Sequence, residues 1–308
     1  MTQEQKPVAG RRTDRFGAIV REAIERGPKM EMRDIDFLII GATKSATTWL
    51  QQSLQQDPGI FMPDPELHYF SRYYERGDEW YLEHFADQEH RLLHGEKSNS
   101  YMDVPEAAER IKEKLPEARL IAQLRNPVDR AYSDYCMLYR RAEVGRDIAQ
   151  YLDPRQGAGG RFLNGGLYYQ QLQGYLDRFP AEQILVLLYE DLKIDARAQL
   201  ARVRGFLGLE ADVPLKPLAK KVKDKSEPVV NPTLRRLLRP LKPVAAPFRQ
   251  NTGFKKLRSL IAGELQYAPL SHDLRARMTD YFAPETEKLG ALVGRDLTDW
   301  LRNRSPEK

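Results

Sequence analysis

The stretch DIDFLIIGATKSATTWL, residues 34–50, decides the fold class of this chain. Its apolar run, residues 36–40, has the length of one buried strand, and it stops at Gly41. Small hydroxyl residues and one lysine follow, and then a segment, 47–56, that we expect to be helical. Strand, loop and helix in this order form the outline of a phosphate-binding loop. The Walker pattern G-x-x-x-x-G-K-S/T is not present in it, because the lysine comes early, at Lys44.

Two further apolar runs, residues 118–125 and 183–192, are predicted to be buried strands. Strands that alternate with helices indicate a parallel sheet covered on both faces, so we predict a P-loop-like three-layer α/β fold with a central parallel sheet flanked by helices. The helix after the second strand has a strong start, because Asn126 can cap it and Pro127 suits a first turn. The other helices are expected at 80–85, 104–115, 166–179, 195–207 and 271–290.

The composition indicates a globular protein that could bind an anion. Of the 308 residues, 41% are hydrophobic and 30% are charged, and no apolar run approaches the ~20 residues of a bilayer-spanning helix. The net charge of +5 is compatible with an anionic ligand but too small to indicate nucleic acid by itself. One cysteine, Cys136, excludes an internal disulfide and a multi-cysteine metal site. The polar N-terminus lacks the apolar core of a signal peptide, so we expect a cytoplasmic protein.

We expect one domain, residues 34–308, preceded by a basic leader at 1–33. Residues 212–258 hold most of the later prolines and many lysines and arginines, and we interpret them as an irregular basic excursion rather than a second core. The segments TLRRLLRPLKP and RQNTGFKKLRSL from this region could present a basic face to an anionic acceptor or to a membrane surface. An ordinary surface helix is the simpler interpretation.

The loop after Gly41 has the groups that hold a phosphate. A helix that starts near Thr47 would aim free backbone N–H groups and the positive end of its dipole at one point. Lys44 adds a mobile charge, and Thr47 and Thr48 add hydroxyl donors. The alternative is an ordinary strand-to-helix turn with a solvated lysine.

A second group that could bind an anion stands at the end of the strand predicted at 118–125. A magnesium-dependent nucleotide hydrolase needs an acidic residue at the end of such a strand to hold the metal. This strand ends instead in Arg125, whose planar guanidinium group can bind a phosphate through two hydrogen bonds. Ser133 lies two helical turns further on, so Arg125 and Ser133 could hold a second phosphate some distance from the first. The alternative for Arg125 is an ion pair with Asp129.

The strand at 183–192 does end in acids, Glu190 and Asp191. They keep a metal-dependent kinase or nucleotide hydrolase open as an alternative function. Capping of the next helix explains these acids equally well. Two phosphate-binding groups without an obvious metal site suggest instead a nucleotide that carries phosphates at both ends of its ribose.

Six ordered motifs make the chain resemble the sulfotransferase family. They are FLIIGATKSATTWL, PELHYF, GEKSNSY, LRNPVDRAYSDY, GLYYQQLQGYLDRFP and ILVLLYEDL. The chain is most similar to the heparan-sulfate-type and related bacterial carbohydrate sulfotransferases, from about residue 36 to 209 and more weakly at 273–294. The resemblance implies that 3′-phosphoadenosine 5′-phosphosulfate (PAPS) is the sulfuryl donor, with 3′-phosphoadenosine 5′-phosphate (PAP) as its product, and that no metal is needed.

By this resemblance the loop binds the 5′-phosphosulfate, and Lys44 lies near its bridging oxygen. Arg125 and Ser133 match the family's contacts to the 3′-phosphate. The family often has glycine where Ala46 stands, and because alanine disfavours positive φ, we expect ordinary dihedral angles in this loop. The loop residues concerned are Thr43, Lys44, Ser45, Ala46, Thr47 and Thr48.

Glu66 in PELHYF matches the catalytic glutamate of the heparan-type enzymes, which implies a base that takes the acceptor's proton. His68 would then lie on the acceptor side or behind Glu66. The other class of sulfotransferases uses a histidine base, so the two roles could be exchanged. Without the resemblance, a solvated carboxylate and a partly buried ring are the simpler interpretations of this pair.

Lys97 in GEKSNSY matches a family lysine near the transferred group, where it would neutralise charge on the sulfonate oxygens. The alternative for Lys97 is an ion pair with Glu96. Tyr168 in GLYYQQ could line the acceptor cleft or pack in the core. The family often places a lysine- and serine-containing loop over the nucleotide, and KVKDKSEP could be that loop or a solvated charged loop. Its candidate residues are Lys223, Lys225 and Ser226.

Residues and resemblance together predict a bacterial sulfotransferase that moves the sulfuryl group to a hydroxyl, in preference to an amine, of a glycoconjugate or specialised metabolite. A magnesium-dependent kinase or hydrolase is the alternative enzyme. A nucleotide-binding module without catalysis is the alternative from another class, and the presence of Lys44, Glu66 and Lys97 speaks against it.

Overall fold

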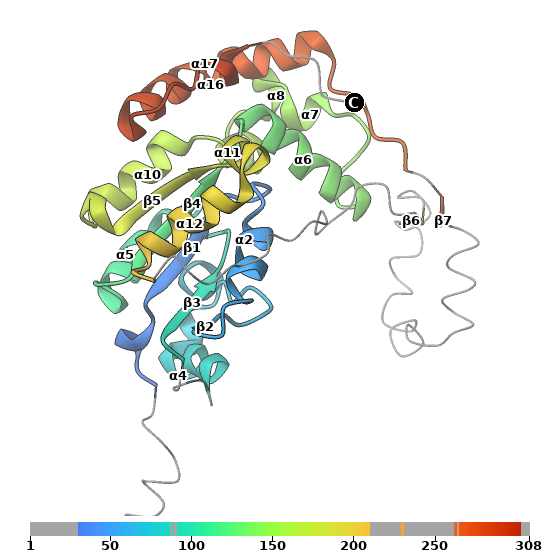
Figure 1. Ribbon diagram of the computed structural model, residues 1–308. Coiled ribbons are helices and arrows are strands. Elements are labelled where there is room, and N and C mark those ends of the chain that lie inside the picture. The colour runs from blue at the N-terminus through green and yellow to red at the C-terminus, as the bar shows by residue number, and fades with distance from the viewer. Residues whose placement is uncertain are drawn as a thin grey trace, which may run out of the picture.

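A five-stranded, fully parallel sheet forms the centre of the protein (Figure 1). The computed structural model describes residues 30–86, 88, 91–209 and 265–302, together with the backbone of two short antiparallel strands, β6 (Val229–Val230) and β7 (Ala262–Gly263). The strand order is β2-β3-β1-β4-β5. The strands are β1 (Phe37–Gly41), β2 (Ile60–Phe61), β3 (Leu93–Lys97), β4 (Arg119–Leu124) and β5 (Ile184–Leu188).

Helices cover both faces of this sheet, which confirms the predicted fold class (Figure 1). Helices α5 and α10 pack on one face and α2 and α12 on the other. The bounds are α2 (Thr47–Leu54), α3 (Tyr69–Arg72), α4 (Gly77–Leu82), α5 (Pro105–Lys114), α6 (Pro127–Arg140), α7 (Ala149–Leu152), α8 (Pro154–Gly157), α9 (Arg161–Asn164), α10 (Tyr168–Leu176), α11 (Tyr189–Ile194), α12 (Ala196–Phe206), α16 (His272–Val293) and α17 (Thr298–Leu301), with short 3₁₀ turns at Met32–Asp34, Tyr74–Arg76, Glu83–Phe85 and Ala181–Gln183.

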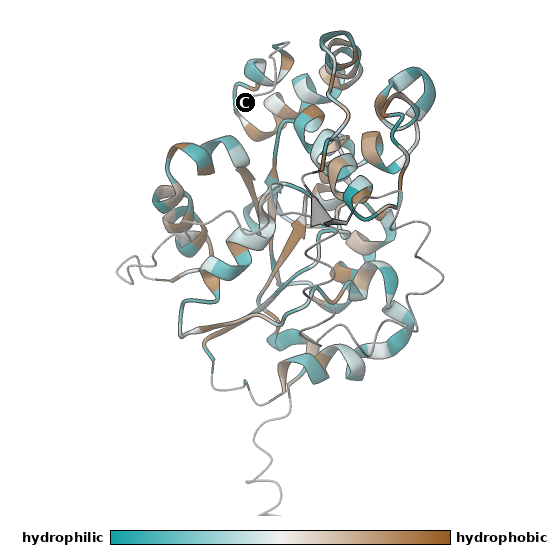
Figure 2. Cartoon of the chain, turned by 90° about the vertical axis from the view of Figure 1, so that its right-hand side faces the viewer, coloured by the Kyte–Doolittle hydropathy of each residue, from teal (hydrophilic) through white to brown (hydrophobic). Residues whose placement is uncertain are grey.

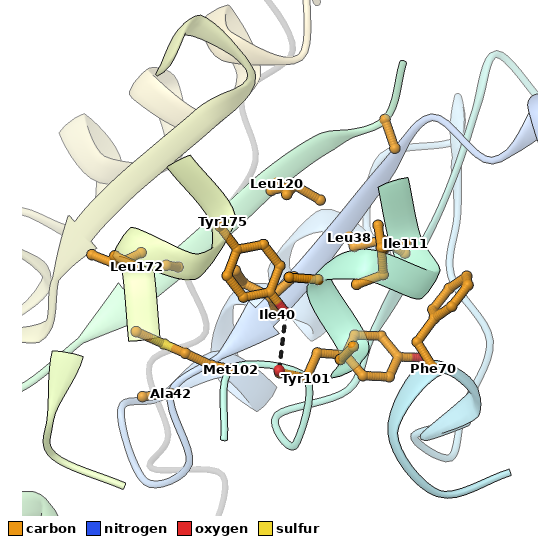
Figure 3. Close-up of a cluster of buried hydrophobic side chains, with 14 of the residues drawn as sticks. Leu38, Ile40, Ala42, Phe70, Tyr101, Met102, Ile111, Leu120, Leu172 and Tyr175 are labelled. Carbon is orange, nitrogen blue, oxygen red and sulfur yellow. Dashed lines mark hydrogen bonds between the residues drawn. The ribbon is translucent and has the colours of Figure 1, made fainter. Parts of the chain in front are cut away.

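Strand β1 divides the core into two layers because its side chains alternate between the sheet faces. Leu38 and Ile40 point to the layer under α5 and α10, where Tyr175 donates a hydrogen bond to the carbonyl of Tyr101 at 2.9 Å (Figure 3). Phe37 and Ile39 point to the layer under α2 and α12. Every residue of β1 is buried, as expected of a central parallel strand, and Figure 2 shows apolar strands between helices with polar outer faces.

A third apolar cluster joins α6 to the short helices α7–α9 and to α16. The predicted cap of α6 is confirmed, because the Asn126 side chain accepts hydrogen bonds from the N–H groups of Val128 and Asp129 at 3.0 and 3.3 Å. The predicted start of α16 at Ser271 is confirmed in the same way. Both capped helices belong to this third cluster and pack against each other.

Two of the sequence predictions need correction. Strands β2 and β3 were not expected, because β3 reads LHGEK and lacks an apolar run; its pairing with β1 nevertheless buries it. The strand predicted at 183–192 ends at Leu188, where the chain turns into α11. Glu190 and Asp191 therefore lie on a helix and not at the end of a strand.

Two predicted regions lie largely outside the described residues: the leader, of which residues 1–29 are not described, and the basic excursion at 212–258 apart from β6. The described body begins before residue 34, because Met30 already packs in the core. No helix in the described part is long and apolar enough to cross a bilayer.

Candidate active site

The site lies where β1 and β4 end side by side. The chain leaves β1 through a loop into α2, on one face of the sheet, and leaves β4 through α6 to α10, which lies on the other face. Helices that depart to opposite faces from neighbouring parallel strands open a crevice at the carboxyl edge. Lys44 follows β1 and Arg125 follows β4, so both enter this crevice.

The loop before α2 has an unusual backbone. Lys44 and Ala46 have φ values of 71° and 67°, in the left-handed region. The expectation of ordinary dihedral angles at Ala46 is therefore wrong, and the loop adopts the turn that a glycine would favour. The left-handed conformation costs an L-residue about 1–2 kcal/mol and persists only where the surrounding structure imposes it, as at ligand sites.

This turn leaves the start of α2 open to a ligand. The helix begins at Thr47, and Ala46 at its N-cap provides no side-chain hydrogen bond. The N–H groups of the first turn and the helix dipole then favour an anion. Ser45 and Thr47 are buried, whereas Thr43, Lys44, Ala46 and Thr48 are half-buried. The loop therefore combines an uncapped helix start with hydroxyl donors, and its binding of a phosphate stays a prediction.

Arg125 lies against this loop. Its Nη1 donates to the carbonyl of Lys44 at 3.4 Å, and its guanidinium stacks over the ring of Tyr189, 4.7 Å from the centroid. Asp129, the alternative partner, pairs instead with Arg275 at 2.6 Å. The structure therefore places the guanidinium fork beside the loop.

Ser133 lies on the face of α6 that is turned to the loop. One turn further along this face, the sulfur of Met137 is 3.8 Å from Lys44 Nζ. Ser133 itself is buried, and among the described residues no hydrogen bond joins it to Arg125. The structure thus brings both predicted 3′-phosphate residues to the loop, but not into contact with each other.

Glu66 and Lys97 form the central ion pair of the site. Lys97 Nζ donates to Glu66 Oε1 at 2.6 Å and lies 3.4 Å from the hydroxyl of Thr48. Lys97 does not pair with Glu96, because successive residues of β3 point to opposite faces. Glu96 is fully buried and accepts hydrogen bonds from the hydroxyls of Ser98 and Tyr101.

Asn99 also belongs to the site, although it was not among the residues that the motifs predicted. Its backbone N–H donates to Glu66 Oε2 at 3.2 Å, and its side-chain Nδ2 donates to Glu66 Oε1 at 3.1 Å. Its Oδ1 accepts from the hydroxyl of Thr47 at 2.6 Å. Asn99 lies in the motif GEKSNSY, two residues after Lys97, and this place in the motif is the signal that could have identified it.

Glu66 is held in its ionised form. Partial burial by itself would raise the pKa of this carboxyl, but the charge and hydrogen bond of Lys97 and the N–H of Asn99 outweigh burial and lower the pKa below its ordinary value. At neutral pH the carboxylate is therefore charged and saturated with donors. A carboxylate in this state is a weak base until some of these donors leave it.

His68 lies beside Glu66 as a neutral ring. Burial is the main reason that its pKa is lowered, and the nearby Glu66 only partly offsets it. Its Nδ1 is 2.7 Å from the hydroxyl of Ser100, and its Nε2 is 3.7 Å from Glu66 Oε2. The backbone of His68 is left-handed, with φ of 52°, and Ser98 fixes it by accepting its N–H at 2.8 Å.

The acids considered for a metal site are engaged elsewhere. Glu190 accepts the backbone N–H of Asn126 at 3.1 Å, and Asp191 forms two hydrogen bonds of 2.9 Å with Arg295. In the part of the chain that is described, no group of three or more His, Cys, Asp or Glu residues could hold a metal ion. Glu190 and Asp191 thus have structural partners.

Tyr168 lies in the core beside Arg125, and the predicted nucleotide-covering loop lies outside the described residues. Tyr168 is 1% exposed, and its hydroxyl donates to the carbonyl of Arg125 at 2.9 Å. Tyr168 therefore packs in the core and does not line a cleft. Its hydrogen bond holds the backbone of Arg125 in place. Lys223, Lys225 and Ser226 lie outside the described residues.

The fold and the site have the features of an α/β enzyme class: a loop suited to an anion at the carboxyl edge of a parallel sheet, with a carboxylate–lysine pair beside it. The chain belongs to the sulfotransferase family, because the family model described as the sulfotransferase domain matches residues 34–235. The resemblance inferred from the six motifs is thereby confirmed.

Curated and solved relatives support this assignment. The chain is 34% identical over 178 residues to human heparan sulfate glucosamine 3-O-sulfotransferase 6, covering 56% of this chain and 52% of that protein. It is 33% identical over 186 residues to human heparan sulfate glucosamine 3-O-sulfotransferase 3B1, covering 56% and 46%. The chain thus spans about half the length of the curated relatives it matches. The crystal structure of a sulfotransferase from Alicyclobacillus acidocaldarius is similar with a TM-score of 0.64, at 25% identity over 87% of this chain and 99% of that one.

Proposed function

We propose that this protein transfers the sulfuryl group of PAPS to a hydroxyl of a glycoconjugate or specialised-metabolite acceptor. The observation that carries the proposal is the Glu66–Lys97 pair, 2.6 Å apart, beside a loop built to hold an anion. The similarity to two 3-O-sulfotransferases of heparan sulfate favours a carbohydrate hydroxyl as the acceptor.

The chemistry of the site fits this donor. Its groups are cations and hydrogen-bond donors with one carboxylate, as an anionic nucleotide and a hydroxyl acceptor require. The loop from Thr43 to Thr48 would hold the 5′-phosphosulfate, and Arg125 with Ser133 would hold the 3′-phosphate. When bound, the donor supplies a sulfuryl group on a phosphate leaving group.

Glu66, Lys97 and Lys44 then have separate roles in the transfer. Glu66 takes the proton of the acceptor hydroxyl, and Lys97 turns from Glu66 to the sulfonate oxygens. This turn has a second effect: once Lys97 leaves, the main cause of the lowered pKa of Glu66 is removed, and the carboxylate becomes a stronger base. Lys44 offsets the charge that develops on the phosphate oxygen.

Calorimetric titration with PAP, run beside ATP with Mg²⁺, tests the donor class. We expect micromolar binding of PAP and little binding of ATP. Turnover of labelled PAPS against a panel of polysaccharides, oligosaccharides and small hydroxyl compounds then tests the acceptor. Tight magnesium-dependent binding of ATP without binding of PAP would contradict the proposal and favour a kinase or hydrolase. Binding of PAP without turnover of any acceptor would favour a binding module.

A further inference from the structure

Asn99 connects the two halves of the site. Its Oδ1 accepts the hydroxyl hydrogen of Thr47 at the first residue of α2, and its Nδ2 donates to Glu66 Oε1. One amide group therefore contacts both the loop proposed to hold the donor and the carboxylate proposed to act as the base. The two hydrogen bonds, at 2.6 and 3.1 Å, fix which way the amide is turned.

The backbone around Asn99 is fixed, whereas its side chain is half-buried. The N–H groups of Ser98 and Met102 donate to the carbonyls of Ile39 and Ile40 in β1 at 3.1 and 3.0 Å. The backbone N–H of Asn99 is thus held in place against Glu66 Oε2. A change at this residue is confined to rotation of its amide.

The hydroxyl of Thr47 cannot serve two acceptors, because it has one hydrogen. In this structure it gives that hydrogen to Asn99 Oδ1. Thr47 is also the first residue of α2, where a 5′-phosphate would lie. If the hydroxyl turns to a phosphate oxygen, Asn99 loses the donor that fixes its amide, and its bond to Glu66 Oε1 is weakened.

We propose that Asn99 is a positioning residue that couples donor binding in the loop at 43–48 to the release of Glu66 for the acceptor. In this structure Glu66 Oε1 is covered by Lys97 and by the amide of Asn99. Donor binding draws the hydroxyl of Thr47 to the phosphate and frees the amide. Glu66 then keeps the backbone N–H of Asn99 on Oε2 and turns Oε1 to the acceptor. The inference rests on the proposed function.

PAP isolates this coupling, because it has the 5′-phosphate but no sulfonate to attract Lys97. The test is a ¹³C NMR titration of the glutamate carboxyls with and without PAP, with the signal of Glu66 assigned by its loss in Glu66→Gln. In the unmodified protein we expect PAP to raise the pKa of Glu66 by roughly 0.5–1, the worth of one hydrogen bond. In Asn99→Ala we expect no such rise, and PAP binding that is as tight or up to about threefold tighter.

Three further variants keep the test decisive. Thr47→Val removes the hydroxyl and is expected to abolish the rise, whereas Thr48→Val, its matched control one residue on, is expected to preserve it because Thr48 contacts Lys97 and not Asn99. Should Asn99→Ala fail to fold, Asn99→Asp keeps an acceptor for Thr47 but cannot donate to Glu66, and it should also abolish the rise.

The outcomes separate the inference from the proposed function. Binding of PAP with no change in the pKa of Glu66, or a rise that persists in Asn99→Ala, would overturn the coupling and leave the sulfotransferase proposal intact. Absence of PAP binding in calorimetry would overturn both.

Discussion

Lys97 Nζ lies 2.6 Å from Glu66 Oε1, so the cation and the carboxylate of the site satisfy each other. Lys97 is 3% exposed, which means that its ammonium depends on this partner for charge compensation. The pair therefore keeps two reactive groups in place at the carboxyl edge of the sheet. A sulfonate can take Lys97 from Glu66 because it brings its own negative charge to the ammonium, and Glu66, left without this cation, becomes the stronger base.

Removal of the charge on Glu66 is expected to reduce turnover strongly without changing the affinity for the nucleotide. In Glu66→Gln we expect PAP affinity nearly intact and turnover reduced at least ~100-fold, the usual scale for a lost general base. Calorimetry with PAP and turnover of labelled PAPS measure the two quantities. If turnover were unchanged, Glu66 would not be the base, and His68 would be tested next with His68→Asn.

Arg125 is expected to distinguish nucleotides by their 3′-phosphate. Loss of its charged hydrogen bonds in Arg125→Ala should weaken the binding of PAP by about 1.5–3 kcal/mol, roughly 10- to 150-fold. The binding of adenosine 5′-phosphate should be weakened far less. Arg125→Lys is the matched control, since it keeps the charge and loses the fork. Titrations with both nucleotides give the comparison, and an equal loss for both would mean that Arg125 does not contact the 3′-phosphate.

The left-handed backbone of Ala46 predicts an unusual response to substitution. Ala46→Gly should stabilise the protein by ~0.5–1 kcal/mol, because glycine removes a conformational cost that exceeds its own entropic penalty. Ala46→Val should destabilise it by at least ~1 kcal/mol, since a β-branched residue tolerates this conformation poorly. Chemical unfolding of the three proteins measures the order, and equal stabilities would contradict it.

Glu96 predicts a pH dependence of stability. Full burial raises its pKa to about 7, while the two hydroxyl partners only partly offset burial. Below pH 4.5 the carboxyl is protonated in both the folded and the unfolded chain. Between pH 4.5 and about 7 only the unfolded chain loses the proton, so this group makes the folded state less stable as the pH rises.

Glu96→Gln lacks this ionisation, and it should gain stability relative to the unmodified protein over that interval. The expected gain is on the order of 2–3 kcal/mol, at about 1.4 kcal/mol per pH unit. Unfolding free energies of both proteins at pH 4.5, 5.5 and 7.5 give the difference. Parallel curves for the two proteins would show that Glu96 ionises at its ordinary pH in the folded state.

Local patterns in the sequence were sufficient for part of this structure. The strands at 36–40 and 118–125 are continuous apolar runs, and the helix after Asn126 has its cap and its proline in place, so each is decided by neighbouring residues. β3 could not be predicted in this way, because LHGEK is buried by its neighbour β1 and not by its own hydrophobicity.

The sequence by itself determined the fold class, because this depends on periodicity within short stretches, and its motifs and family resemblance pointed to the loop, Arg125, Glu66 and Lys97 as candidate site residues. Only the tertiary structure decided that Lys97 pairs with Glu66 and not with Glu96, and that Asn99 joins Thr47 to the base. Both depend on contacts between residues more than thirty positions apart in the sequence, which arise when β1 and β2 both pair with β3 and the carboxyl ends of the three strands meet at one edge.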